Sequence, residues 1–230
     1  MDGDVQIAPV AALLGEPARA AIVGALESGQ ALPAAELARR AAVSPSTASE
    51  HLARLVEGGL LAVEPRGRHR YYRLASAEVA HAVEALSAIA PRGPVRSLRA
   101  ANTASALTEA RTCYDHLAGR LGVAVAGALV RRRALRHTDG GFERGARAGS
   151  VFAALGIDLH AVEKARRPFA LSCLDWSERE PHVAGALGAA IASRAVEAGW
   201  LRRRSDSRAL DVTDAGRDAF AAELGLQLDR

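Results

Sequence analysis

The sequence predicts a mainly α-helical protein with small β-hairpin wings, in which an N-terminal winged helix-turn-helix precedes a helical C-terminal domain. Three observations lead to this fold. A cap residue and a proline, Ser44-Pro45, stand at the start of a segment with apolar residues at helical spacing. A turn with proline and glycine at 65–68 separates two β-prone runs. Beyond a Pro/Gly linker at 91–95 the chain is rich in alanine.

Three helices are expected before the hairpin. Apolar residues at helical spacing predict the first over 17–29, the second over 33–43 and the third over 45–57. Gly58-Gly59 ends the third helix, because glycine readily adopts the left-handed conformation common at helix C-termini. A short helix, a tight turn and a longer helix in this order are typical of a helix-turn-helix.

A hairpin and one more helix complete the N-terminal domain. The β-prone runs 60–64 and 69–74 are the expected strands, and Ser76 can cap a helix that ends at the Pro/Gly linker. We therefore expect a DNA-binding and dimerisation domain over 1–90 and an effector or regulatory domain over 96–230.

The third helix and the hairpin carry the side chains that DNA recognition needs. Small polar residues near the start of a recognition helix approach base edges, and arginines on a wing neutralise phosphates. Residues 1–94 hold nine arginines against ten acidic residues, so the local arginine cluster, and not bulk charge, must supply the phosphate contacts. The predicted DNA contacts are Ser44, Ser46, Thr47, Ser49, Glu50, His51 and Arg54 on the helix and Arg66, Arg68, His69 and Arg70 on the wing.

Residues 8–90 resemble the ArsR-type family of bacterial winged-helix repressors. The segments that carry the resemblance are 36–39, 44–55, 58–61 and 67–74. The resemblance implies a homodimer that binds double-stranded DNA at an inverted-repeat operator and is released from it by an effector. In many members of that family the effector is a metal ion.

The chain departs from the family's metal-sensing patterns. The first helix of the helix-turn-helix has Glu36-Leu-Ala-Arg-Arg40 where such members carry cysteines. Other members of the family carry metal ligands on the helix that forms the dimer. Of these ligands only His81-x-x-Glu84 is present here, and we expect this pair on the solvated surface. An effector site is therefore expected in the C-terminal domain.

The C-terminal domain contains an internal repeat. The motif His-x-Ala-Gly-x-Leu-Gly begins at His116 and recurs at His182, so the copies span 116–156 and 182–225. Each copy is expected to form a helix, a short basic hairpin and a helix. The domain is therefore also a candidate for a degenerate second winged helix.

Each copy follows a cysteine. If the copies pack about a pseudo-dyad, Cys113, His116, Cys173 and His182 converge as a Cys₂His₂ set that binds zinc or another thiophilic metal. The cysteine-to-histidine separations of three and nine residues match no close pair, so other interpretations stay open. They are buried structural thiols, a redox pair, and an organic effector bound by Tyr114, Asp115, Phe169, Asp175 and Trp176.

The sequence predicts a dimeric, DNA-binding repressor that is released by a metal ion, a thiol-reactive species or a small molecule. One alternative is an architectural or protein-interaction winged-helix protein. Another is a fused enzyme with Cys113 as nucleophile and His116 as base, which the absence of Gly-x-Ser-x-Gly and Gly-Lys-Ser motifs disfavours, so we expect no enzyme. No apolar run approaches the roughly 18 residues of a membrane span, and a cytoplasmic location without membrane contact is expected.

Overall fold

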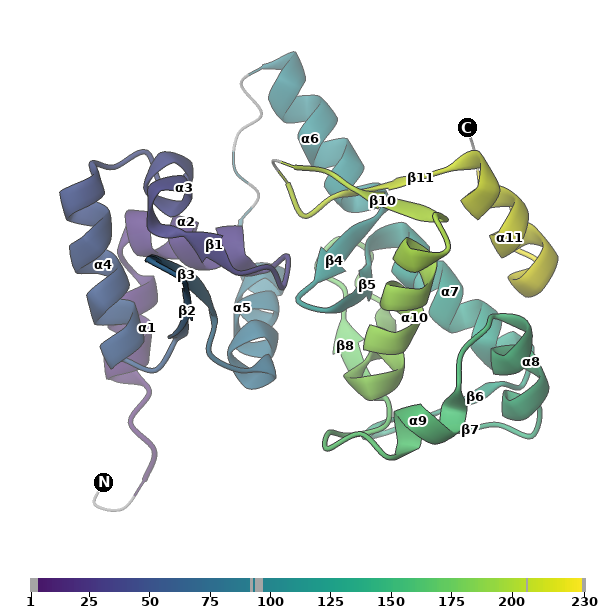
Figure 1. The fold of residues 1–230 in the computed structure, drawn as a ribbon. Helices are drawn as coiled ribbons and strands as arrows, with labels where there is room; N and C mark the ends of the chain where they lie inside the picture. Colours follow the sequence, from purple (N-terminus) through teal and green to yellow (C-terminus); the bar gives the residue numbers. More distant parts are fainter. Residues whose placement is uncertain (1–3, 92, 94–96, 206, 229–230) are drawn as a thin grey trace. The chain divides into compact units, whose positions relative to one another are not determined.

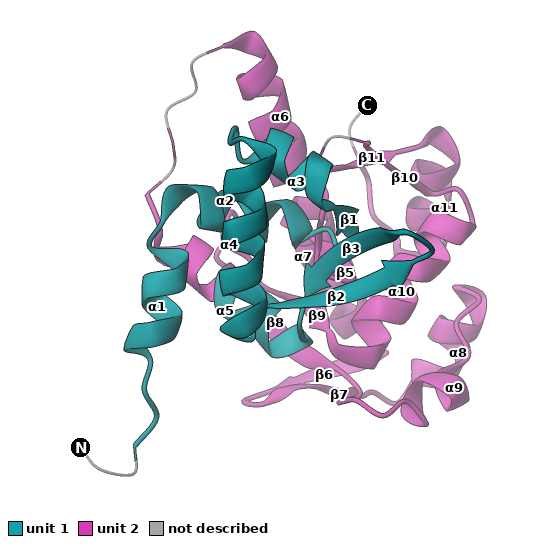
Figure 2. Ribbon diagram, turned by 60° about the vertical axis from the view of Figure 1, so that its left-hand side comes forward, with its two compact units in different colours: residues 1–83 teal, residues 84–230 magenta. Residues whose placement is uncertain are grey.

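The computed structural model describes residues 4–91, 93, 97–205 and 207–228 (Figure 1). The chain forms two compact units, unit 1 (Met1–Val83) and unit 2 (Glu84–Arg230) (Figure 2). The division falls inside helix α5 (Ala77–Ile89). The predicted linker includes Arg92 and 94–95, which lie outside the described residues.

Unit 1 is a helix-turn-helix with a wing. Its other helices are α1 (Ala8–Leu14), α2 (Pro17–Leu26), α3 (Ala34–Arg40) and α4 (Pro45–Glu57). The sequence predicted α4 with the same bounds, since Ser44 caps it through a hydrogen bond that its Oγ accepts from the Thr47 N–H at 3.2 Å. We did not predict α1, because all seven of its residues are apolar and no polar face reveals a helical periodicity.

The wing of unit 1 belongs to a three-stranded antiparallel sheet. Strand β3 (His69–Leu74) lies between β1 (Leu32–Pro33) and β2 (Leu61–Arg66). Arg66 pairs with His69, so a two-residue turn joins β2 to β3, and Gly67 supplies the positive φ of 59° that such a turn requires. The predicted winged helix-turn-helix is confirmed, with β1 as an additional two-residue strand.

Unit 2 is mixed α/β, with two more hairpins than the helical domain with one basic hairpin in each copy that the sequence predicted. Four two-stranded antiparallel hairpins alternate with its helices. The strands of the two hairpins that were not predicted have only three or four residues, too few for an alternating pattern to be recognised in an alanine-rich sequence. The elements are α6 (Leu98–Glu109), β4 (Arg111–Cys113), β5 (His116–Ala118), α7 (Gly119–Arg131), β6 (Leu135–Thr138), β7 (Gly141–Arg144), α8 (Ala148–Ala154), α9 (Leu159–Glu163), β8 (Leu171–Leu174), β9 (Pro181–Ala184), α10 (Gly185–Glu197), β10 (Leu201–Arg203), β11 (Leu210–Val212) and α11 (Asp214–Leu224).

The internal repeat extends one hairpin further towards the N-terminus than the sequence indicated. Hairpin β4–β5 precedes α7, β6–β7 and α8, and hairpin β8–β9 precedes α10, β10–β11 and α11. Helix α10 packs against β5 of the first copy (Figure 1), and α7 packs against β9 of the second copy. Equivalent side chains of the two copies are buried in one shared core. Examples are Leu121 with Leu187 and Phe152 with Phe220. The two copies are therefore related by a pseudo-dyad.

The repeated glycines have a structural reason. Gly119 and Gly185 begin α7 and α10 with φ of 79° and 78°. A Cβ atom at these positions would lie 2.8 Å and 2.7 Å from a backbone carbonyl oxygen of the preceding segment. Only glycine meets both requirements without strain, which explains the Ala-Gly step in each copy of the motif.

Among the described residues, no single helix is both long and apolar enough to cross a membrane. The pair α1 and α2 has the necessary combined length and composition, but the two helices are bent by 87°.

Candidate metal centre

The first hairpin of each copy places a cysteine directly opposite a histidine. Cys113 pairs with His116 across β4–β5, and Cys173 pairs with His182 across β8–β9. The sequence separations differ only because the second hairpin has a longer loop. The unequal cysteine-to-histidine separations in the sequence therefore do not make the geometry of the two pairs different. They are no argument against a metal site.

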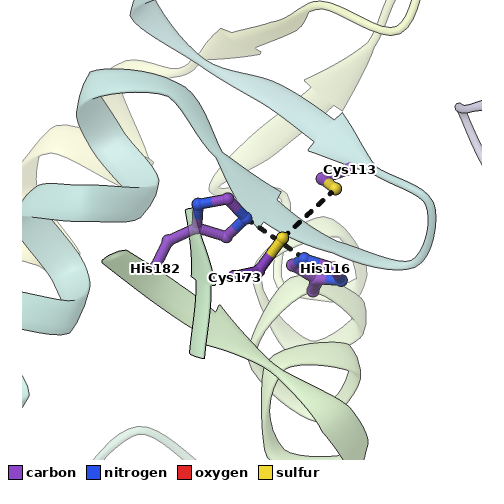
Figure 3. A group of neighbouring side chains, drawn as sticks. All are labelled: Cys113, His116, Cys173 and His182. Carbon is purple, nitrogen blue, oxygen red and sulfur yellow. Dashed lines mark hydrogen bonds between the residues drawn. The ribbon is translucent and has the colours of Figure 1, made fainter. Parts of the chain in front are cut away.

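The pseudo-dyad brings both pairs to one buried point (Figure 3). The ligand atoms of Cys113, His116, Cys173 and His182 all lie within 4.8 Å of one another, and all four residues are buried. The two Sγ atoms are 4.0 Å apart and the two Nε2 atoms are 3.1 Å apart. We name these four residues the Cys₂His₂ cluster.

The second glycine of each motif makes room for the histidine of the other copy. A Cβ atom at Gly188 would lie 3.0 Å from the Cβ of His116, and one at Gly122 would lie 3.6 Å from the Cβ of His182. The same Cβ atoms would also clash with backbone carbonyl oxygens at 2.2 Å and 2.5 Å. The repeated sequence motif thus specifies the close approach that forms the cluster.

The spacing of the cluster fits tetrahedral zinc. Zinc binds sulfur at about 2.3 Å and nitrogen at about 2.0–2.1 Å, so a regular tetrahedron separates two sulfurs by about 3.8 Å and two nitrogens by about 3.3 Å. The observed separations of 4.0 Å and 3.1 Å differ from these values by only a few tenths of an ångström. This donor set could hold a metal ion such as zinc with little movement.

A carboxylate lies behind each imidazole. Asp115 Oδ1 is 3.3 Å from Nδ1 of His116, and Asp175 Oδ2 is 3.6 Å from Nδ1 of His182. Arg167 donates a hydrogen bond to Asp115. Carboxylates in this position fix the tautomer and ring orientation of metal-binding histidines.

The Cys113 thiol is not activated as a nucleophile. A hydrogen bond with Cys173, together with burial, raises the pKa of the Cys113 thiol above its ordinary value. Reactive cysteines need a lowered pKa and access to solvent, whereas Cys113 is buried. This arrangement disfavours a catalytic thiol, and a metal ion would have to displace the thiol protons when it binds.

Next to the cluster lies a buried ionic network that the sequence analysis missed. Arg111 Nη2 donates to Glu84 Oε1 at 3.1 Å and to Asp175 Oδ2 at 2.9 Å. Glu84 Oε2 accepts from Arg208 at 3.1 Å, and Asp175 Oδ2 accepts from the Gly119 N–H at 2.6 Å. The expectation that Glu84 lies on the solvated surface is wrong, because only 1% of it is exposed.

Both carboxylates of this network are held ionised. Burial alone would raise the pKa of Glu84, but the charges of Arg208 and Arg111 outweigh burial and hold it below the ordinary value. For Asp175, burial is likewise outweighed by the charge of Arg111 and by hydrogen bonds from Ser177 and Gly119, so its pKa is also lowered.

Two of the residues predicted for an organic effector, Trp176 and Phe169, have different surroundings. Trp176 lines a pocket of about 490 Å³ in unit 2 with Leu107 and Arg208, and the described lining does not include Tyr114 or Phe169. Phe169 packs against the core of unit 2 instead.

The residues predicted to contact DNA lie on two exposed segments of unit 1. Four side chains of α4 and four of the wing are exposed, namely Ser46, Ser49, Glu50, Arg54, Arg66, Arg68, His69 and Arg70. Ser44 is exposed as well, and its Oγ lies 2.8 Å from Oγ1 of the half-buried Thr47. His51 differs, since its Nε2 lies 3.7 Å from Glu16 and its side chain is only 15% exposed.

Two comparisons by sequence identify relatives of the chain. The helix-turn-helix domain family matches residues 14–64. A protein of Bacillus subtilis (strain 168), named an uncharacterized HTH-type transcriptional regulator YdfF, is 44% identical over 222 residues. That alignment covers 96% of this chain and 98% of the relative, so both units are included.

Solved structures match only part of the chain. The transcriptional repressor BigR from Xylella fastidiosa is 26% identical over 38% of this chain and 88% of its own, with a TM-score of 0.35. The homodimeric winged helix-turn-helix domain of a possible ArsR-family transcriptional regulator from Mycobacterium bovis is 25% identical over 39% of this chain and 89% of its own, with a TM-score of 0.34.

The winged helix-turn-helix of unit 1 and the full-length relative agree with the resemblance found in the sequence. The chain belongs to the ArsR-type family of DNA-binding, HTH-type transcriptional regulators.

Proposed function

We propose that this regulator is a homodimeric repressor whose Cys₂His₂ cluster binds zinc or another thiophilic metal ion, and that the ion releases it from an inverted-repeat operator. Residues 1–90 bind DNA and dimerise, and residues 96–230 hold the effector. The helix–hairpin–helix order of each copy favours interpreting the effector domain as a pair of degenerate winged helices.

One observation carries the effector assignment. Two thiols and two imidazoles from hairpins about 60 residues apart in sequence converge within 4.8 Å of one another, and their S–S and N–N separations are close to those of a zinc tetrahedron. Buried thiols that served only to fill the core would not require two histidines beside them, each backed by a carboxylate.

The experiment is a titration of the purified, reduced protein with zinc. We expect one ion per chain by elemental analysis, and a fall in affinity for the operator when that ion is bound. Footprinting should locate an inverted repeat that is protected only in the metal-free state. A protein that binds no zinc, or an operator affinity that zinc does not change, would contradict the proposal.

Exposed apolar residues support dimerisation. In unit 1, Val10 on α1 and Ile7 immediately before it are exposed, and in unit 2 Leu86 and Ile89 on α5 are exposed. A contiguous patch of such groups is typical of a protein–protein contact surface, whereas single exposed apolar residues are common. We propose that α1 and α5 carry the dimer contacts.

The wing arginines are proposed to contact phosphates, so an Arg66→Ala, Arg68→Ala variant should weaken binding on all DNA sequences alike. Each lost phosphate contact should reduce the slope of log K against log salt by about 0.9. Fluorescence anisotropy over a series of salt concentrations measures both effects. Arg120→Ala, at an exposed arginine in unit 2, is the matched control and should leave the slope unchanged. An unchanged slope in the wing variant would remove these arginines from the interface.

The start of α4 is proposed to read base edges, so Ser49→Ala should lower specificity more than affinity. Loss of one base contact costs about 1–3 kcal/mol of discrimination. The ratio of operator affinity to random-DNA affinity should therefore fall by about tenfold, while the salt slope stays as in the parent. Equal losses on both DNAs would show that Ser49 supports only the backbone contacts.

A second candidate effector is an oxidant. The two Sγ atoms are 4.0 Å apart, close enough for a small movement to join them. With hydrogen peroxide, two thiols would form one disulfide while peroxide is reduced to two waters. Thiol titration before and after peroxide, with operator binding as the readout, distinguishes this candidate from zinc.

A further inference from the structure

Three buried charges connect the Cys₂His₂ cluster to helix α5. Asp175 and Arg111 are fully buried and Glu84 is 1% exposed. Hydrogen bonds join Asp175 to Arg111 and Arg111 to Glu84, all within unit 2. Buried ion pairs seldom stabilise a fold more than apolar residues of the same volume would. Such a network beside a candidate metal centre therefore suggests a role other than stability.

When both histidines are neutral, the hydrogen bonds place their protons on different ring nitrogens. His116 faces a carboxylate with Nδ1, so that nitrogen carries its proton and Nε2 can accept. His182 then donates from Nε2 to His116 Nε2 at 3.1 Å. Its own Nδ1 is left with a lone pair that makes no hydrogen bond within the described part of the chain, at 3.6 Å from Asp175.

Binding of a metal ion would change the ring nitrogen of His182 that carries the proton. Zinc bound to Nε2 of both histidines takes both lone pairs, so neither Nε2 can carry a proton. A neutral His182 must then hold its proton on Nδ1. That Nδ1–H group would face Asp175 Oδ2, which lies 3.6 Å from Nδ1, and a small movement would bring the two atoms to hydrogen-bond distance.

Asp175 Oδ2 is already shared by two donors, Arg111 Nη2 and the Gly119 N–H. A third donor weakens the hold of this oxygen on Arg111, and Glu84 is the other carboxylate that the same Nη2 contacts. We propose that metal binding is transmitted through His182, Asp175 and Arg111 to Glu84, so that these residues couple the cluster to α5. This inference rests on the proposed function and specifies its regulation.

Helix α5 is suited to receive such a signal. Glu84 lies in the middle of this continuous helix and begins unit 2, while the first turns of α5 belong to unit 1. The helix begins three residues after the end of the wing strand β3. A shift of Arg111 towards Glu84 therefore acts on an element that both units share. Energetic coupling between sites requires such a contiguous element whose position both sites bias.

The test compares the full chain with Glu84→Gln, which keeps the size of the side chain but removes its charge. Glu84→Gln should bind zinc as the parent does, because it contacts none of the four cluster residues. Coupling between sites is typically about 5- to 150-fold. We expect zinc to lower operator affinity by a factor in this range in the parent and by less than about twofold in the variant. Glu163→Gln removes an exposed partner of Arg144 and is the control.

The outcomes separate this inference from the proposed function. If zinc changes nothing in the parent, the proposed function fails, and the coupling fails with it. If zinc changes operator affinity equally in the parent and in Glu84→Gln, only the coupling route is overturned. Circular dichroism checks that each variant is folded.

A second measurement uses the unmodified protein, so it tests the inference even if a variant does not fold. Nitrogen-15 NMR of histidine side chains distinguishes the two tautomers by which ring nitrogen carries the proton. We expect His182 to change from the Nε2–H to the Nδ1–H form when zinc is added, and His116 to keep its Nδ1–H. If His182 already carries its proton on Nδ1 in the metal-free protein, the coupling step is overturned.

Discussion

A Cys113→Ser, Cys173→Ser double variant is expected to bind zinc more than about 100-fold more weakly than the parent. Loss of a residue that only orients a ligand typically costs about 10- to 100-fold in metal affinity, and here two of the four ligands themselves are removed. Serine matches cysteine in shape, but its hydroxyl does not ionise to replace a thiolate. The variant should bind the operator as the metal-free parent does and should no longer respond to zinc.

Competition with a chromophoric chelator under reducing conditions measures the affinity, and thermal unfolding gives an independent readout. Zinc at about 1,000 times its dissociation constant should stabilise the parent by about 4 kcal/mol, and this gain should vanish in the variant. Ser172→Ala, at an exposed position of β8, is the control. A double variant that retains the parent's zinc affinity would place the metal elsewhere and leave the cysteines as core residues.

The helix-turn-helix was predictable because its signals are local. Ser44 and Pro45 mark the start of α4, and Gly58-Gly59 follows its end. The wing is equally local, since a two-residue turn joins its strands. The hairpins β4–β5 and β8–β9 of unit 2 have no comparable signal, and they position the four cluster residues.

The cluster was predictable in its membership and not in its geometry. Repetition of the His-x-Ala-Gly motif suggested a pseudo-dyad and hence the correct four residues. Sequence separation was a poor guide, because Cys113 and His116 occupy the same cross-strand relation as Cys173 and His182 despite different loops. Cross-strand register depends on where each hairpin turns, which the sequence did not show.

The ionic network was not predictable, because its members are far apart in the chain. Arg111 is 27 residues from Glu84 and 64 residues from Asp175. Nothing in the local sequence of Glu84 distinguishes it from the exposed acidic residues of other amphipathic helices. Only the packing of unit 2 brings these charges together.

Replacing the arginine of this network should be strongly destabilising. Arg111→Met keeps much of the side-chain length but leaves Glu84 and Asp175 buried without their shared partner. Removing one member of a buried ion pair costs about 3–5 kcal/mol, and we expect a loss of this size in the free energy of unfolding. Denaturant titration measures it. Arg144→Met, which breaks the exposed pair with Glu163, is the control and should cost less than about 1 kcal/mol.

The pH dependence of Arg111→Met identifies charge as the cause of this loss. The lowered pKa of Glu84 stabilises the parent above the unfolded-state pKa, and this contribution is lost as the pH falls through the folded-state pKa. Without Arg111, burial acts on Glu84 with less opposition and raises its pKa, so the variant is penalised most near neutral pH. The difference between parent and variant should therefore narrow as the pH falls from neutral to below the ordinary pKa of a glutamate, because Glu84 is protonated at a higher pH in the variant than in the parent. A difference that stays constant over this range would attribute the loss to packing around Arg111, because packing does not titrate.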